Sequence, residues 1–147
     1  MAHILVADDD TALAEIWKDA LEDGGHTVET AGTGSQALTL LREGDFDLLI
    51  TDVNMPDGSG IYTTSEARFL QKRIPIIVAS GNAGVISSGM LVRLPKIGAD
   101  QVLIKPVDVD ALLKAVADAL KNGPKLTIWD LVRALFPRQL PKEQRNG

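Results

Sequence analysis

The chain has 147 residues, is 45% hydrophobic and carries a formal net charge of −5. This length suits one compact domain with a full core and leaves no room for a second, catalytic domain. The chain has no cysteine, which excludes a disulfide framework and a cysteine-based zinc site. No apolar run is long enough for a signal peptide or a membrane span, so we expect a cytoplasmic protein without membrane contact.

The charge is unevenly distributed along the chain. Residues 1–121 carry ten Lys/Arg against eighteen Asp/Glu, whereas residues 122–147 carry five against two. Affinity for DNA rests largely on neutralisation of phosphates by basic groups, so the acidic body argues against direct nucleic-acid binding.

Five apolar, β-branched runs are predicted to be strands: Ile4 to Ala7, Thr27 to Thr30, Asp47 to Thr51, Ile74 to Ala79 and Gln101 to Ile104. The first predicted helix spans Thr11 to Asp23 and places Leu13, Ile16, Trp17 and Leu21 on one apolar face. Further helices are predicted over Ser35 to Glu43, Ile61 to Lys72, from about Met90 onward, and Asp108 to Lys121.

Strands that alternate with helices indicate an α/β fold with a parallel sheet and helices on both faces. For five such units we expect the flavodoxin-like, doubly wound strand order 2-1-3-4-5. This order places the first and third strands side by side. Their carboxyl ends carry Asp8, Asp9 and Asp10 on one strand and Asp52 on the other.

These four carboxylates are predicted to meet at one end of the sheet. Two such charges 4 Å apart repel by about 4 kcal/mol at an effective dielectric constant near 20, so a cation should offset them. Since there is no cysteine and His3 and His26 are expected far away, oxygen ligands favour Mg²⁺. An alternative is that Asp9 and Asp10 only cap the first helix, and we favour that alternative for Asp10.

Two further polar groups end the predicted fourth and fifth strands. Ser80 follows one apolar run and Lys105 ends another, immediately before Pro106. A lysine beside carboxylates can pair with them and hold a phosphoryl oxygen, and a hydroxyl can donate a hydrogen bond to another.

Four sequence motifs together resemble the receiver domain of the response-regulator family, the phosphoacceptor part of two-component signalling. They are ILVADDD, DLLITDVNMPDGSG, IPIIVASG and VLIKPV, and the resemblance covers about residues 3–121. It implies that Asp52 is the phosphorylated aspartate and that Lys105 and Ser80 contact the phosphoryl group. It also implies a magnesium site made by Asp8, Asp9, Asp52 and the main-chain carbonyl of Asn54, and a cis peptide bond between Lys105 and Pro106.

By the same resemblance the chain is a signalling switch that assists its own phosphorylation and dephosphorylation, not a conventional enzyme. Its partners would be a histidine kinase or histidine phosphotransfer protein and an unknown downstream protein.

One residue departs from the family's pattern. Many receivers have an aromatic residue three positions before the lysine, where this chain has Val102. The output could therefore run through the fourth helix alone, and we expect residues 81–98 to change their order on phosphorylation. The alternative function is a phosphorylation-independent interaction or dimerisation module on the same fold.

The stretch from Ala31 to Ala37 imitates a dinucleotide-binding fingerprint, GxGxxA. That motif normally opens the first strand–helix unit, where this chain has three aspartates that would repel a pyrophosphate. We therefore interpret it as a tight turn and a helix start.

We divide the chain into a receiver domain, residues 1–122, and a C-terminal extension, residues 123–147. The extension is predicted to form a short amphipathic helix at about 126–136, whose apolar face carries Ile128, Trp129, Val132, Leu135 and Phe136. This helix could pack on its own body or bind a partner. A homodimer through it, or through the fourth and fifth helices, is a further possibility.

Overall fold

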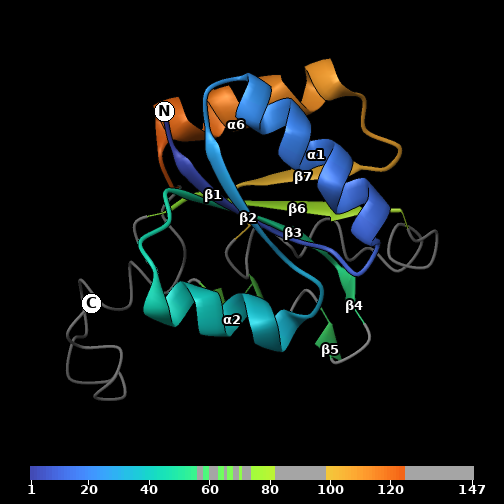
Figure 1. The fold of residues 1–147 in the computed structure, drawn as a ribbon, viewed down its shortest axis with the longest axis vertical. Helices are drawn as coiled ribbons and strands as arrows, with labels where there is room; N and C mark the ends of the chain where they lie inside the picture. Colours follow the sequence, from blue (N-terminus) through green and yellow to red (C-terminus); the bar gives the residue numbers. More distant parts are fainter. Residues whose placement is uncertain are drawn as a thin grey trace.

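A computed structural model describes residues 1–55, 58–59, 63–64, 66–67, 70, 74–81 and 99–124, and every structural statement below refers to these residues. Five parallel strands form one sheet in the order β2-β1-β3-β6-β7 (Figure 1). They are β1 (His3–Ala7), β2 (Thr27–Ala31), β3 (Leu48–Asp52), β6 (Ile76–Ser80) and β7 (Gln101–Ile104). Counted along the chain, this is the predicted order 2-1-3-4-5, and the flavodoxin-like α/β fold is confirmed.

The strand boundaries differ slightly from those that the sequence predicted. The third strand reaches Asp52, and the fourth begins at Ile76 and includes Ser80. Both polar residues lie in the ladder, where Asp52 is opposite Ala79 and Ser80 is opposite Ile104. The sheet therefore fixes the backbone of both candidate site residues.

Two faces of the sheet are covered by helices. Figure 1 shows α1 (Thr11–Asp23) and α6 (Val109–Asn122) on one face and α2 (Gly34–Glu43) on the other. Successive residues of a strand point to opposite faces, so Leu5 packs in the cluster with α2 while Ile4 and Val6 pack in the cluster with α1 and α6. Strands that are apolar on both faces are typical of a central parallel sheet.

Each helix begins at a polar cap. The side chains of Asp10, Thr33 and Asp108 accept hydrogen bonds from the backbone N–H groups of Leu13, Gln36 and Ala111. The capping role favoured for Asp10 is thus confirmed, and Thr33 starts α2 within the stretch that imitates a dinucleotide motif.

One core prediction is wrong. Ile16 was placed on the buried face of the first helix, but 56% of it is exposed. The buried residues of α1 are Ala14, Trp17 and Leu21. At about 100° per residue, Ile16 points away from the stripe that they form.

A small two-stranded antiparallel ladder follows β3. It pairs β4 (Asn54–Met55) with β5 (Gly58–Ser59), in a stretch where no strand was predicted. The signal that could have indicated it is the Pro-Asp-Gly sequence at 56–58, which is typical of a turn between two strands.

Several predicted segments lie partly or wholly outside the described residues. In the predicted helix at 61–72, the described positions 63–64, 66–67 and 70 are helical. The helix expected from about Met90, nearly all of the 81–98 segment and the helix at about 126–136 lie outside them. Within the described part of the chain, no helix has the length and apolar character needed to cross a membrane.

Candidate functional site

Three carboxylates converge at the carboxyl end of the sheet. Asp8 follows β1, Asp9 comes next, and Asp52 is the last residue of β3, the neighbouring strand. Each contributes one oxygen, and these oxygens all lie within 4.8 Å of one another. Asp8 and Asp52 are only 2% and 8% exposed, whereas Asp9 is exposed to solvent. The predicted strand order thus brings together acids that are 43 or more positions apart in the sequence.

Asp8 is held from two directions. Its Oδ1 accepts a hydrogen bond of 2.9 Å from the backbone N–H of Asp10, just before α1 begins. Its Oδ2 accepts a hydrogen bond of 2.7 Å from Nζ of Lys105. The start of α1 and the end of β7 therefore both orient this one carboxylate.

Lys105 joins two of the acids. Its Nζ lies 2.7 Å from Asp8 Oδ2 and 3.4 Å from Asp52 Oδ2, and only 19% of its side chain is exposed. Its backbone N–H donates a 2.8 Å hydrogen bond to the carbonyl of Ser80, which anchors the residue to the end of β6. The peptide bond between Lys105 and Pro106 is cis, as the resemblance implied.

The pKa of Lys105 reflects this environment. Burial alone would lower the pKa, but the hydrogen bond to Asp8 and the negative charges of Asp52 and Asp8 outweigh the burial, so the pKa of Lys105 is raised. Lys105 therefore stays a cation at neutral pH. Three carboxylates still face one ammonium group, and a surplus of negative charge remains at the site.

Sequence reasoning missed two residues that define the path of the lysine side chain. The ring centroid of the buried Trp17 lies 6.0 Å from Lys105 Nζ, at the outer limit of a cation–π contact. A Cβ built on Gly81 would lie 3.3 Å from the Cβ of Lys105, which is tighter than ordinary van der Waals contact. Trp17 was expected only to fill the core, and the glycine after Ser80 was the only available signal for this close approach.

The two other predicted site residues are Ser80, which ends β6, and Asn54, which begins β4. Ser80 is fully buried at the end of β6, one position beyond the partner of Asp52. Asn54 begins β4 two residues after Asp52, so its backbone follows the acidic cluster directly. Its side chain lies outside what the structure describes.

The donor set fits a small, hard cation. All three groups are carboxylates, and opposite ligands of an octahedral Mg²⁺ lie roughly 4.2 Å apart because each bond is about 2.1 Å long. Adjacent ligands lie closer, roughly 3.0 Å apart. The three oxygens, which here lie within 4.8 Å of one another, would therefore move together to share one ion. Cys and His, which suit softer metals, do not contribute to this cluster among the described residues.

Comparison with known proteins identifies the fold and its family. Residues 4–117 match the family model of the response regulator receiver domain. The transcriptional regulatory protein ZraR of Escherichia coli K12 is 38% identical over 119 residues, which cover 81% of this chain and 26% of ZraR. The DNA-binding transcriptional regulator NtrC of Azospirillum brasilense is 36% identical over 122 residues, covering 83% of this chain and 25% of NtrC. The chain spans about a quarter of the length of the curated relatives that it matches.

Similar solved structures of comparable size are also response regulator receiver domains. A CheY-like receiver domain from Methanospirillum hungatei has a TM-score of 0.76 and 30% identity, covering 83% of this chain and 95% of its own. The response regulator TrrA of Thermotoga maritima, solved in complex with Mg²⁺-BeF, has a TM-score of 0.71 and 30% identity, covering 80% and 98%. On the strength of its sheet order, its acidic cluster and these matches, the chain belongs to the response regulator receiver domain family.

Proposed function

We propose that the chain is a Mg²⁺-dependent phosphoacceptor, in which Asp52 takes a phosphoryl group from a histidine kinase or a histidine phosphotransfer protein. The observation that carries this proposal is the cluster of Asp8, Asp9 and Asp52 with Lys105, whose Nζ lies 3.4 Å from an oxygen of Asp52. The cluster combines a nucleophile, a cation-binding set of oxygens and a fixed positive charge.

The reaction is a displacement at phosphorus. An Oδ of Asp52 forms a bond to phosphorus while the bond from phosphorus to the donor's imidazole nitrogen breaks, and the electron pair leaves with that nitrogen, which takes up a proton. Transfers of this kind depend mainly on positioning and electrostatic stabilisation. Asp52 is the last residue of β3, and the ladder with β6 holds its backbone in place.

Lys105 supplies the positive charge that belongs to the protein. A phosphoryl group bonded to Asp52 places its oxygens near the Nζ that now contacts Asp52 Oδ2. The buried Ser80 would donate a hydrogen bond from its hydroxyl to another of these oxygens. When bound by Asp8, Asp9, Asp52 and the carbonyl of Asn54, Mg²⁺ would offset the remaining negative charge.

Phosphorylation would change the surface through local electrostatics. The product carries about −1.5 to −2 charges, assuming a phosphomonoester-like titration, and several acceptor oxygens beside Ser80 and Lys105. If Ser80 and Lys105 moved, the conformation of the end of β6 and of the segment that follows Gly81 would change with them. Val102 is partly buried and packs against the cluster on the α2 face, so an inward swing of an aromatic ring is not available at this position.

The test is the intact mass of the full chain after incubation with acetyl phosphate and Mg²⁺. We expect the mass of one phosphoryl group to be added, and we expect chelation of Mg²⁺ or the substitution Asp52→Asn to prevent the addition. Asp118→Asn, an exposed aspartate on α6, is the matched control and should be phosphorylated normally. Equal uptake by Asp52→Asn, or none by the unmodified chain, would favour the phosphorylation-independent interaction module.

A further inference from the structure

The ammonium group of Lys105 lies at unequal distances from its two carboxylate partners. Its Nζ is 2.7 Å from Asp8 Oδ2 and 3.4 Å from Asp52 Oδ2. A lysine side chain is a point charge on a long, flexible stem, so two ion pairs alone do not fix one position for its ammonium group. Transfer to Asp52 requires that position to be well defined, because the lysine has to meet an oxygen of the incoming phosphoryl group.

Two neighbours limit different parts of this side chain. A Cβ built on Gly81 would lie 3.3 Å from Cβ, 3.6 Å from Cδ and 3.9 Å from Cγ of Lys105, so the glycine backbone lies along the stem. The charged end lies over the indole ring of Trp17, with Nζ 6.0 Å from the ring centroid. Gly81 therefore limits the stem, and Trp17 limits the ammonium group.

The alternation of the strands puts Trp17 on the same face of the sheet as the charged groups. The residues two positions before Asp8, Asp52 and Lys105 all belong to, or pack against, the core cluster that contains Trp17. Successive residues of an extended chain point to opposite faces, so the three charged side chains share the face of that cluster. Figure 1 shows α1, which carries Trp17, on this face.

Helix α1 also fixes the carboxylate that Lys105 contacts most closely. Trp17 is only 2% exposed, and Asp8 accepts the backbone N–H of Asp10, the N-cap of the same helix. One rigid element thus sets the position of the ring and of Asp8. The negative face of an aromatic ring attracts a cation, and the indole of Trp does so most strongly. A further carboxylate in this place would add to the surplus of negative charge, whereas a ring adds no charge.

We propose that Trp17 is a positioning residue for phosphoryl transfer, whose ring holds the ammonium group of Lys105 within reach of both Asp8 and Asp52. Trp17 does not touch the phosphoryl group and acts through the lysine. The role in transfer rests on the proposed phosphoacceptor function, but the contact between Trp17 and Lys105 does not.

The first test is the rate of phosphorylation of the full chain by acetyl phosphate and Mg²⁺, followed by intact mass and expressed per folded protein. Trp17→Leu keeps an apolar side chain but removes the ring, and should slow the reaction about three- to tenfold, the range that a lost cation–π contact gives. Trp17→Phe keeps a ring and should react within about twofold of the original rate. In the Lys105→Ala background, Trp17→Leu should cause no further slowing.

Three results of this first test would overturn the proposal. One is an unchanged rate in Trp17→Leu. Another is a rate in Trp17→Phe as low as that in Trp17→Leu, since the ring would then be irrelevant. The third is a further slowing by Trp17→Leu when Lys105 is already alanine, because the tryptophan would then act without the lysine.

The second test uses no phosphodonor and measures reductive methylation of individual lysines by peptide mass. The side chain of Lys105 is 19% exposed and paired with two acids, so it should react more slowly than Lys114, which is exposed on α6. Trp17→Leu should speed the methylation of Lys105 several-fold and leave that of Lys114 unchanged. No change at Lys105 would overturn the contact.

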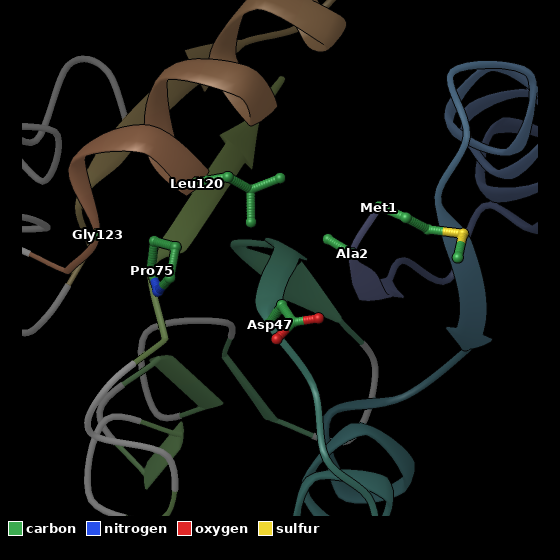
Figure 2. A pocket seen from close by; sticks show the side chains of 6 residues that line it. All are labelled: Met1, Ala2, Asp47, Pro75, Leu120 and Gly123. Atoms are coloured by element: carbon green, nitrogen blue, oxygen red, sulfur yellow. The ribbon is translucent and has the colours of Figure 1, made fainter.

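Leu120→Ala is the matched control for loss of stability. Leu120 is a partly buried leucine of α6 that packs against the same cluster as Trp17. It lines a hollow of about 350 Å³ among the amino ends of the strands, where Figure 2 shows it beside Asp47 and Pro75, the residues immediately before β3 and β6. Leu120→Ala should lower the melting temperature but change neither the methylation of Lys105 nor the phosphorylation rate.

The two tests separate the failure of each proposal. Equal acceleration of Lys105 methylation in Leu120→Ala and Trp17→Leu would mean that lost stability alone exposes the lysine, and would overturn the role of Trp17. A chain that takes up no phosphoryl group but shows faster methylation of Lys105 in Trp17→Leu alone would overturn the phosphoacceptor function and the role in transfer. It would at the same time confirm that Trp17 places Lys105.

Discussion

The two ends of the sheet contain the same kinds of residues but use them differently. At the amino end, carboxylates accept hydrogen bonds from the backbone: Asp47 from His3, and the buried Asp100 from Ile76 at 2.7 Å. At the carboxyl end, Asp8, Asp9 and Asp52 face one another, and Asp8 and Asp52 share a single lysine. A carboxylate that meets N–H groups stabilises the fold, whereas carboxylates that meet each other create a demand for a cation. The difference lies in the partners and not in the residue type.

The largest expected effect is that of removing the shared cation. Lys105→Ala should slow phosphorylation of Asp52 by about 10²-fold or more, the usual cost of losing one preorganised charge-stabilising group. The same change should tighten Mg²⁺ binding, because the acids lose their internal counter-charge. Phosphorylation is measured by intact mass over time, and Mg²⁺ affinity by calorimetric titration.

Lys114→Ala is the control for this prediction, because Lys114 is exposed on α6. If Lys105→Ala weakened both Mg²⁺ binding and phosphorylation, the lysine would be needed mainly to keep the site folded. The charged residues at the carboxyl end of the sheet would then mainly stabilise the fold, as those at the amino end do.

The next largest effect belongs to the amino end. Asp100→Ala leaves the backbone N–H of Ile76 without its carboxylate acceptor and should lower the free energy of unfolding by about 1–3 kcal/mol. The phosphorylation rate of the folded fraction should not change. Urea unfolding and the intact-mass assay measure the two quantities, and Asp118→Ala, at an exposed position, should change stability by less than about 0.5 kcal/mol. A slowed reaction in Asp100→Ala would mean that the two ends are coupled.

A smaller change tests how precisely Lys105 must be placed. Gly81→Ala brings a methyl group to 3.3 Å from the lysine Cβ, so the side chain must shift by a few tenths of an ångström. We expect phosphorylation to slow roughly tenfold, since displacements of about 1 Å can cost 10²-fold. Gly32→Ala, whose new Cβ would meet only an oxygen of Gln36 at 4.0 Å, should react at the original rate. Equal rates in the two variants would show that the site tolerates this displacement.

The smallest effect concerns pH at the amino end. Burial, and then the positive charge of the N-terminal amine, lower the pKa of His26, whose Nδ1 accepts the backbone N–H of Ala2. The folded state thus prefers neutral His26, and the unfolded state binds more protons once the pH falls below about 6.5. Stability should therefore fall slightly as the pH falls through this value. In His26→Gln the melting temperature should fall less than in the unmodified chain as the pH is lowered from 8 to 5.5. The same pH dependence of the melting temperature in both proteins would contradict this prediction.

The sequence predicted the fold well because β1, β3 and β6 are apolar on both faces and α1, α2 and α6 each begin at a polar cap. It predicted the convergence of Asp8, Asp9 and Asp52 because the strand order follows from the alternation of elements. It did not predict that Ile16 is exposed, because a mixed helical face leaves the exact direction of burial open. The hydrogen bond of Asp47 to His3 and the close approach of Gly81 to Lys105 depend on three-dimensional packing, which no local pattern encodes. The roles of Ser80 and Asn54, and the division at residue 122, stay predictions.

Lys105 and Asp8 are hydrogen-bonded although they lie 97 positions apart in the sequence, so they are synthesised at different times. All of the acids leave the ribosome early, but the lysine that balances two of them comes with the last strand of the sheet. A nascent or truncated chain without β7 carries the acidic residues and lacks their counter-charge. The site is therefore complete only when the edge strand β7 pairs with β6 and brings Lys105 to Asp8 and Asp52.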